Sequence, residues 1–530
     1  MIKAIRGTRD LLPPDTDLWN RVEAKVRDVF ARYNFHEIRT PIFEDTQLFS
    51  RSVGEETDIV TKEMFTWFNG PDPALALHYL WRTQYEHQYQ HLEMLELGIS
   101  TYGYLALDSN GATAMIRISA QPDARELTFM RQYRSDWMGD HLGTALPILV
   151  LAYPTSRTAT VSALHLGEIK AQQISTPGGF RLPESLTLRP ENTAGVVRAY
   201  IEHGLDKTGA LQKLYYIGPQ FRRERPQKGR YRQFYQIGAE IVGPPSAGSE
   251  SPARDAEVLE MLATLLDELG LRGWTLQLNS VGCAADRARY NQALREALQP
   301  VVATMCADCQ RRAETNPLRV LDCKVPEDQP IIEKLPRISE YLDDACRENF
   351  AAVRAMLDAV GVPYTINERM VRGLDYYTRT TFEFTHGDLG AQSAVLGGGR
   401  YDGLSESLDG PKAPGIGFAI GEDRLILALQ AEGVTADVKL DAYIAPLGPD
   451  MNAHALKLAR ELRRAGVRCD LGDESFRLKK SFEAAEKAGA RYIVIVGENE
   501  VKSGEFAVKE LSSGKQEPVT REKLAEYLRR

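Results

Sequence analysis

The sequence has few cysteines and no long apolar segment. Six cysteines among 530 residues are too few for a disulfide framework, so a cytoplasmic protein with reduced thiols is the default expectation. No apolar run reaches the roughly 18 residues that a membrane-spanning helix needs. The longest one, residues 146–153, contains a proline and is better suited to a buried strand. The N-terminus carries charges where a secretory signal peptide needs an apolar segment.

A general excess of positive charge is also missing. The formal net charge of −8 argues against a protein that coats nucleic acid non-specifically, so any site for a polyanion must be local. No Gly-x4-Gly-Lys-Ser/Thr segment occurs, which excludes a P-loop. The contents of 43% hydrophobic and 26% charged residues are typical of a soluble globular protein. A length of 530 residues allows about three or four domains of roughly 150 residues each.

One segment stands out against this acidic background. Residues 222–232 contain six cations within eleven positions. The flanking segments 214–218 and 234–242 are rich in aromatic and branched residues, which predicts two β-strands with the cations on the loop between them. The loop is either a solvated basic surface or a phosphate-binding loop for a nucleotide or a nucleic acid.

Three further segments combine residue types that suit ligand binding. In residues 188–194 a strand ends and a helix begins, where Asn192 or Thr193 is either a simple N-cap or a ligand contact. Residues 371–377 place an arginine, an acid and two phenols together, which suits a planar polar ligand. Segments 397–403 and 415–425 are rich in glycine, which lets the backbone approach a ligand, and Arg424 falls in the first turn of a predicted helix.

The combination of these segments resembles the histidyl-tRNA synthetases, which are class II aminoacyl-tRNA synthetases. Residues 40–44 resemble the dimer-interface motif of the class, and Phe221-Arg222-x-Glu224 with its basic loop resembles the second motif. Gly421-x-x-Arg424-Leu425 resembles the third motif. Residues 372–377 resemble the signature that distinguishes the histidine enzymes. The resemblance covers residues 1–68 and 183–530.

The resemblance implies an α+β fold: a six-stranded antiparallel catalytic sheet flanked by helices, and a C-terminal α/β anticodon-binding domain at 438–530. The catalytic core is expected at 1–69, 181–282 and 367–430, and a helical insertion at 283–366. Residues 70–180 match nothing in the family. We expect an insert of mixed α and β character, which is either an accessory domain or a poorly folded passenger.

Local patterns predict individual elements independently of that resemblance. Apolar periodicity and capping residues predict helices at 16–34, 193–203 and 255–269. Strands are expected at 38–43, 186–189, 275–279, 380–384 and 415–420. The alternation of strands and helices after residue 442 predicts a small α/β domain with a largely parallel core sheet.

By resemblance, the protein is a cytoplasmic homodimer that activates L-histidine with ATP and Mg²⁺ and transfers it to tRNA(His). The catalytic residues implied are Arg222 and Arg372, which bind the α-phosphate, and Arg424, which binds the γ-phosphate. Arginine suits this role because its planar fork matches phosphate oxygens and its charge offsets the repulsion between two anions. Glu224 is expected near the adenine, and Arg230 near the ATP.

The resemblance also implies a histidine pocket. Glu240 and Tyr377, with Tyr401, are matched to the imidazole, and the remaining histidine-binding residues implied are Glu191, Thr193, Gln236, Arg372 and Tyr376. Gln227, Arg230 and Arg232 are expected to meet the acceptor end of the tRNA. The alternative is a non-charging paralogue such as the regulatory subunit of ATP phosphoribosyltransferase. That paralogue lacks the anticodon-binding domain and has a degraded histidine signature, whereas this chain has both.

The cysteines between residues 306 and 323 allow two interpretations. Cys306, Cys309 and Cys323 are candidate zinc ligands, with Cys283 as a further candidate at an irregular distance. Free buried thiols are the alternative.

Overall fold

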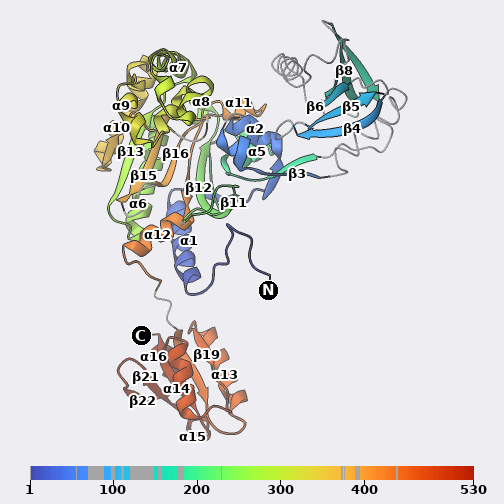
Figure 1. Cartoon of the computed structure of the whole chain (residues 1–530). Coiled ribbons are helices and arrows are strands. Elements are labelled where there is room, and N and C mark those ends of the chain that lie inside the picture. The colour runs from blue at the N-terminus through green and yellow to red at the C-terminus, as the bar shows by residue number, and fades with distance from the viewer. Residues whose placement is uncertain are drawn as a thin grey trace. The chain divides into compact units, whose positions relative to one another are not determined.

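The computed structural model describes residues 2–54, 57–69, 184–227, 229–371, 374, 376–387, 394–436 and 440–529, and the backbone of six strands between residues 89 and 175. The chain divides into two compact units, residues 1–434 and 435–530 (Figure 1). Among the described helices, none has the length and apolar character needed to cross a membrane.

The larger unit is built on an eight-stranded sheet with the order β1-β11-β12-β17-β16-β15-β13-β14. Its six central strands are antiparallel, which confirms the predicted catalytic sheet, and the short strands β1 and β14 add to its edges in parallel. The strands are β1 (His36–Glu37), β11 (Gln212–Phe221), β12 (Gln233–Val242), β13 (Trp274–Ser280), β14 (Tyr364–Ile366), β15 (Thr378–His386), β16 (Ala394–Arg400) and β17 (Gly415–Gly421). Strands β14 and β16 were not predicted. The glycines of β16 conceal its strand character, because glycine is depleted in strands.

The two faces of this sheet differ in chemistry. Since side chains alternate along a strand, the pairing register assigns each residue to a face. On one face, the ring of Phe30 from α1 (Asp15–Arg32) packs 5.4 Å from the ring of Tyr215 and 5.9 Å from that of Phe418. Helix α6 (Pro252–Leu269) packs beside α1 on this apolar face. The opposite face carries Glu240 and receives the start of α5 (Thr193–Glu202).

A three-stranded sheet, β2-β10-β3, contains the ends of the inserted segment. Its strands are β2 (Phe43–Asp45), β3 (Phe65–Asn69) and β10 (Glu184–Leu188). Between β2 and β3 the chain forms the helix α2 (Thr46–Val53) and the short π-helical turn η1 (Ile59–Glu63). Strands β3 and β10 are antiparallel, with Asn69 opposite Glu184. Residues 70–183 therefore leave and rejoin the core at one end of a hairpin.

The predicted strand at 38–43 is wrong for most of its length. Residues 38–42 form no strand, and β1 and β2 lie on either side of them. Pro41 has no N–H to donate to a ladder. Single backbone hydrogen bonds hold the two ends of the segment, from Ile38 N–H to the Tyr215 carbonyl at 2.8 Å and from Arg189 N–H to the Ile42 carbonyl at 2.9 Å. Between them the Arg189 guanidinium donates to the carbonyls of Thr40 and Pro41 at 2.9 and 3.3 Å.

The described part of the inserted segment forms its own six-stranded sheet, in the order β4-β5-β6-β7-β8-β9. All neighbours are antiparallel except β6 and β7. The strands are β4 (Tyr89–Glu96), β5 (Tyr102–Asp108), β6 (Thr113–Ser119), β7 (Ile148–Ala152), β8 (Thr158–His165) and β9 (Glu168–Ser175). Strand β7 confirms the strand predicted from the apolar stretch 146–153. The α part of the mixed character predicted for this segment falls outside the described residues.

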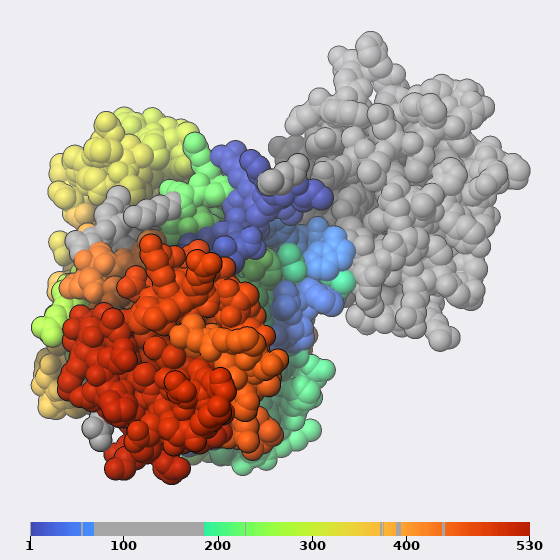
Figure 2. Space-filling view, turned by 90° about the horizontal axis from the view of Figure 1, so that it is seen from below, coloured from blue at the N-terminus to red at the C-terminus, as the bar shows by residue number. Residues whose placement is uncertain are grey.

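Residues 283–366 are mostly helical, as predicted. Short 3-10 turns, including η6 (Pro317–Asp322), alternate with α7 (Ala284–Leu298), α8 (Ala307–Thr315), α9 (Gln329–Ile332) and α10 (Asp344–Val360). Their buried apolar side chains and three of the cysteines make one core cluster, and two further cysteines, partly buried, pack against it. Figure 2 shows these residues, in yellow, gathered into one lobe. The core then ends with α11 (Leu404–Ser407) and α12 (Glu422–Ala431).

The smaller unit is the predicted α/β domain. Its sheet has the order β19-β18-β20-β21-β22, in which β18, β19 and β20 are parallel and β21 and β22 add an antiparallel hairpin. The elements are β18 (Leu440–Pro446), α13 (Met451–Arg464), β19 (Cys469–Leu471), α14 (Leu478–Lys487), β20 (Ala490–Val496), α15 (Glu498–Ser503), β21 (Glu505–Glu510), β22 (Gln516–Thr520) and α16 (Arg521–Leu528).

Candidate active site

The start of α5 is held by a buried carboxylate. Glu191 accepts hydrogen bonds from the backbone N–H groups of Thr193 and Ala194, at 2.7 and 3.0 Å. Asn192 is the N-cap residue by position, as the sequence allowed, but its side chain makes no capping hydrogen bond, and Glu191 supplies that bond instead. The Asn192 amide oxygen instead accepts from the Thr40 hydroxyl at 2.6 Å. The Thr193 hydroxyl donates to Glu240 at 2.7 Å.

Glu240 is a fully buried carboxylate in the middle of β12. Burial raises its pKa to about 8, and the neighbouring charge of Glu191 adds to this rise while the Thr193 hydrogen bond opposes it. The Tyr401 phenol approaches Glu240 closely enough to interact with its charge, but without the geometry of a hydrogen bond. Burial also raises the pKa of Tyr401 well above its usual range.

The glycines of β16 and β17 make room for these side chains. A Cβ on Gly417 would lie 1.6 Å from Oε2 of Glu240, and one on Gly415 would lie 2.4 Å from the Tyr401 ring. A Cβ on Gly399 would lie 2.8 Å from the Tyr377 ring. The predicted reason for glycine here was close approach of backbone to a ligand. At these three positions the structure shows a different reason for glycine: a larger residue would occupy the space that the pocket's own side chains fill.

Several buried polar atoms on this face lack a partner. Among the described residues, none hydrogen-bonds to the Tyr216 hydroxyl, the Gln236 Oε1, the Glu240 Oε2 or the Tyr401 hydroxyl. Electrostatic interactions connect Tyr216 and Tyr401 to Glu240, and Gln236 lies four residues before Glu240 on the same face of β12. Buried polar groups are normally satisfied. A group of four that are not indicates a site for a ligand that supplies both donors and acceptors.

The basic loop begins where β11 ends. Arg222 donates from Nε to the Pro190 carbonyl at 2.9 Å, and its guanidinium lies 5.3 Å from the centre of the Phe234 ring. Its Nη1 is 3.7 Å from a Glu224 oxygen. The other Glu224 oxygen pairs with Arg230 at 2.9 Å.

The tip of the loop packs against α12. Gln227 and Arg230 exchange backbone hydrogen bonds of 3.1 and 2.9 Å, and Gly229 turns the chain with φ +75°. A Cβ on Gly229 would lie 3.0 Å from Leu427 and 3.6 Å from Arg424. Burial lowers the pKa of Arg424, as does the neighbouring charge of Arg230. Three arginines from two distant segments thus gather at one edge of the polar face, which favours a polyanionic ligand.

The other predicted residues have various positions. Arg372, Gly373 and Asp375 lie outside the described residues. The ring of Tyr376 lies 4.8 Å from that of Tyr377 and 6.0 Å from that of Tyr401, so the two phenols of the signature border the Glu240 pocket.

The two remaining loop residues expected to meet tRNA differ in surroundings. Gln227 is exposed. Arg232 turns toward the N-terminal segment: its backbone N–H donates to the Gly7 carbonyl at 2.6 Å, and a Cβ on Gly7 would lie 2.8 Å from its side chain.

Some residues of the site were missed from sequence. Tyr216 faces Glu240, and the alternation of β11 against β12 would have placed it there. Glu383, whose charge raises the pKa of Arg424, lies on the same face in β15. Arg9 pairs with Asp423 of α12 at 2.6 Å and lies over the Tyr231 ring at 4.4 Å. No local signal predicts that contact.

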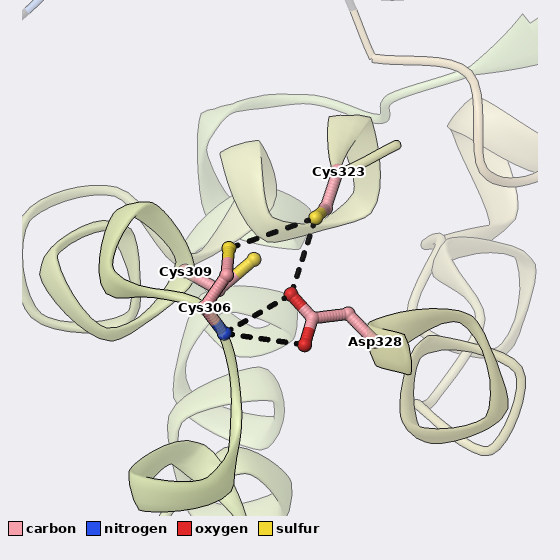
Figure 3. Close-up of side chains that lie close together, drawn as sticks. All are labelled: Cys306, Cys309, Cys323 and Asp328. Atoms are coloured by element: carbon pink, nitrogen blue, oxygen red, sulfur yellow. Dashed lines mark hydrogen bonds between the residues drawn. The ribbon is translucent and has the colours of Figure 1, made fainter. Parts of the chain in front are cut away.

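Five of the six cysteines fall into two clusters, and the sixth, Cys469, lies in the core of the C-terminal domain. Cys306, Cys309 and Cys323 lie together with Asp328, and their potential ligand atoms are all within 4.8 Å of one another (Figure 3). Cys283 is not part of this group; it lies with Asp286, Asp343 and Cys346. The fourth member of the first cluster is a carboxylate that the cysteine spacing did not reveal.

Comparison with known proteins shows which family has the same sequence features as this chain. The family model for "Histidyl-tRNA synthetase" matches residues 182–425, and that for "Anticodon binding domain" matches residues 441–530. The chain is 63% identical to a histidine–tRNA ligase of Koribacter versatilis, over 100% of this chain and 96% of the relative. It is 46% identical to that of Solibacter usitatus, over 100% and 99%. The solved structure of apo histidyl-tRNA synthetase from Staphylococcus aureus covers 100% of both chains, with a TM-score of 0.65 and 31% identity.

Proposed function

Since this chain belongs to the histidyl-tRNA synthetase family, we propose that it activates L-histidine with ATP and transfers the histidyl group to the 3′ adenosine of tRNA(His). The observation that carries this proposal is one sheet face on which a buried, unsatisfied polar pocket lies beside a group of arginines. The full-length relatives are histidine–tRNA ligases. The match to an anticodon-binding domain also favours a charging enzyme over the regulatory paralogue.

The pocket around Glu240 binds the histidine. Two buried carboxylates, Glu191 and Glu240, have raised pKa values because burial disfavours their charge. A ligand with an ammonium group and an imidazole N–H offsets the cost of burying these two carboxylates by donating hydrogen bonds to them. Tyr401, Tyr377 and Gln236 border the ligand. An analogue without ring nitrogens leaves these buried groups unpaired, which disfavours its binding.

The arginines bind the ATP. The histidine carboxylate attacks the α-phosphorus, the bond to the β-phosphate oxygen breaks, and pyrophosphate leaves. Arg222 and Arg372 bind the α-phosphate, so that two anions can approach each other, and Arg424 binds the γ-phosphate of the leaving group. Glu224 and Arg230 border the nucleotide. The step depends on positioning and charge and needs no covalent enzyme intermediate.

Mg²⁺ accompanies the ATP. The charges of Glu224 and Glu383 reach Arg424, where they oppose the lowering of its pKa by burial. Hard carboxylate oxygens of this kind would fit a magnesium ion. When bound, the ion would supply positive charge that offsets the charge of the triphosphate.

The loop tip meets the acceptor end of the tRNA. Gln227 is exposed and Arg230 is 41% exposed, so a phosphate backbone can reach both side chains from solvent. Arg232 packs on the N-terminal segment through its stem and contributes from the base of the loop. The domain at 438–530 binds the anticodon.

The protein functions as a homodimer in the cytoplasm. Ile42, Phe43 and Trp67 are between 39% and 53% exposed, and apolar side chains grouped in this way mark association surfaces. The segment that carries Ile42 and Phe43 is tied to α5 through the hydrogen bond of Thr40 with Asn192, which couples dimer formation to the active site. All six cysteines are free, which fits a reducing compartment.

The test is histidine-dependent exchange of pyrophosphate into ATP, followed by aminoacylation of bulk tRNA with each amino acid. Arg222→Ala and Arg372→Ala are expected to slow exchange by roughly 10²–10³-fold, because each removes a transition-state cation. Arg225→Ala is the matched control: this exposed arginine of the same loop is expected to leave exchange unchanged. Charging with an amino acid other than histidine, or normal exchange in both variants, would refute the proposal.

A further inference from the structure

The cluster of Cys306, Cys309, Cys323 and Asp328 has no role in the proposed reaction. Cys306 is the N-cap residue of α8 and Cys309 lies in its first turn, while Cys323 directly follows η6. Asp328 is the last residue of η7 (Pro326–Asp328) and the N-cap residue of α9. Four ligand atoms therefore converge from three short elements. Cys309, Cys323 and Asp328 are all less than 10% exposed.

The distances in this cluster match those of a tetrahedral zinc site. With zinc–sulfur bonds of about 2.3 Å, neighbouring sulfurs are about 3.8 Å apart, and a sulfur lies about 3.5 Å from a carboxylate oxygen. The Sγ atoms of Cys306 and Cys323 are 3.9 Å apart, and Sγ of Cys323 is 3.2 Å from Oδ2 of Asp328. Figure 3 shows the three sulfurs and the carboxylate directed toward one centre.

The second cluster, Cys283, Asp286, Asp343 and Cys346, differs in how its carboxylates are used. Asp286 accepts from the backbone N–H groups of Cys283 and Asp343, at 3.1 and 3.0 Å, and also pairs with Arg289. Asp343 caps α10 by accepting from Cys346 N–H at 2.7 Å. Its carboxylates already satisfy helix ends. In the first cluster the single carboxylate, Asp328, accepts from only one backbone N–H, that of Cys306 at 3.2 and 3.3 Å, and it faces three thiols.

We propose that Cys306, Cys309, Cys323 and Asp328 bind one structural zinc ion. Three thiolates and a carboxylate are a soft, tetrahedral ligand set that selects zinc over magnesium or calcium. The location also suits a structural metal. Between residues 301 and 342 the longest helix, α8, has nine residues, and most other elements are single turns. This part of the lobe, with so little regular structure, gains stability from a metal that joins its elements.

The zinc ion also holds one wall of a cavity beside the active site. This cavity, of about 460 Å³, is lined by residues 315–319, by Arg287 and Asn291 of α7, and by Tyr377 and Thr381 of the catalytic core. Residues 315–319 belong to the segment between the ligands Cys309 and Cys323. Arg287 donates to the Tyr377 carbonyl at 2.8 Å. The metal therefore fixes a segment that faces a predicted histidine-binding residue.

The experiment measures metal content in the untagged full-length protein, purified without chelators or added metal. Elemental analysis is expected to find one zinc per chain. Cys309→Ser and Asp328→Asn are expected to lower that content at least tenfold and to shift unfolding to lower urea. Cys283→Ser is the matched control, since it alters a thiol of the neighbouring cluster and is expected to retain the zinc.

A second measurement covers the case in which the variants misfold. Zinc is removed from the wild type with a chelator and replaced with Co²⁺, and the absorption spectrum is expected to show thiolate-to-metal charge transfer and tetrahedral ligand-field bands. Three outcomes would overturn the proposal: wild-type protein that holds no zinc and takes up no cobalt, zinc lost from Cys283→Ser as readily as from Cys309→Ser, or a Cys306–Cys323 disulfide found by mass spectrometry of the freshly purified protein.

Discussion

Replacing Glu240 by glutamine is expected to stabilise the ligand-free protein at alkaline pH while it removes histidine activation. Glu240 is fully buried, and burial raises its pKa from an ordinary value of 4.5 to about 8. Between these two values the folded protein keeps a proton that the unfolded chain has lost. Stability therefore falls as pH rises across that window and does not fall further above it.

The magnitude follows from the width of the window. A pKa difference of about 3.5 at 1.36 kcal/mol per pH unit corresponds to roughly 5 kcal/mol. Glutamine has nearly the same shape and no charge, so its oxygen still accepts from Thr193 and the cost of burying a carboxylate disappears. Glu240→Gln is expected to exceed the wild type by a few kcal/mol at pH 8.5 and to equal it near pH 4.5.

The assay is urea unfolding of the ligand-free protein at several pH values, paired with pyrophosphate exchange at saturating ATP. Glu505→Gln, on an exposed residue of β21, is the control and is expected to change neither quantity. Histidine is expected to stabilise the wild type by mass action but not Glu240→Gln. A gain in stability that is the same at pH 5 and pH 8.5, or normal exchange in the variant, would refute the reasoning.

Three other changes test separate parts of the molecule. Gly417→Ala adds a Cβ 1.6 Å from the Glu240 carboxylate. It is expected to lower the free energy of unfolding in urea by about 1–3 kcal/mol and to raise the KM for histidine. Gly387→Ala, where a Cβ meets nothing within 4 Å, is its control. Phe43→Asp places a charge on an exposed apolar surface and is expected to shift the proposed dimer toward monomer in analytical ultracentrifugation. A wild type that is a dimer and a variant that stays one would place the interface elsewhere. Deletion of residues 70–183, closed by a glycine-containing turn, is expected to retain exchange activity because the flanking strands pair at the excision point. A variant that is folded but inactive would show that the insert contributes to the site.

Much of the fold could be predicted because its signals are local. Helices α1, α5 and α6 follow from apolar spacing and from residues at their starts, and β11 and β12 follow from aromatic and branched runs. The errors occur where tertiary contacts replace local preference. Residues 38–42 are held by the Arg189 guanidinium and by one backbone hydrogen bond at each end rather than by a continuous ladder. Strand β16 is built of glycines because neighbouring strands need the space.

The candidate site divides in the same way. The sequence by itself determined which segments supply the site, since the basic loop, the arginine of α12 and the buried acids belong to short, recognisable segments. Only the tertiary structure decided their partners: that Glu191 caps α5, that Thr193 serves Glu240, that Gly229 packs beside Arg424 and that Asp328 joins three cysteines. These contacts join segments that are far apart in the sequence. Strand register and the alternation of side chains decide which residues share a face, and neither can be read from the order of the segments along the chain.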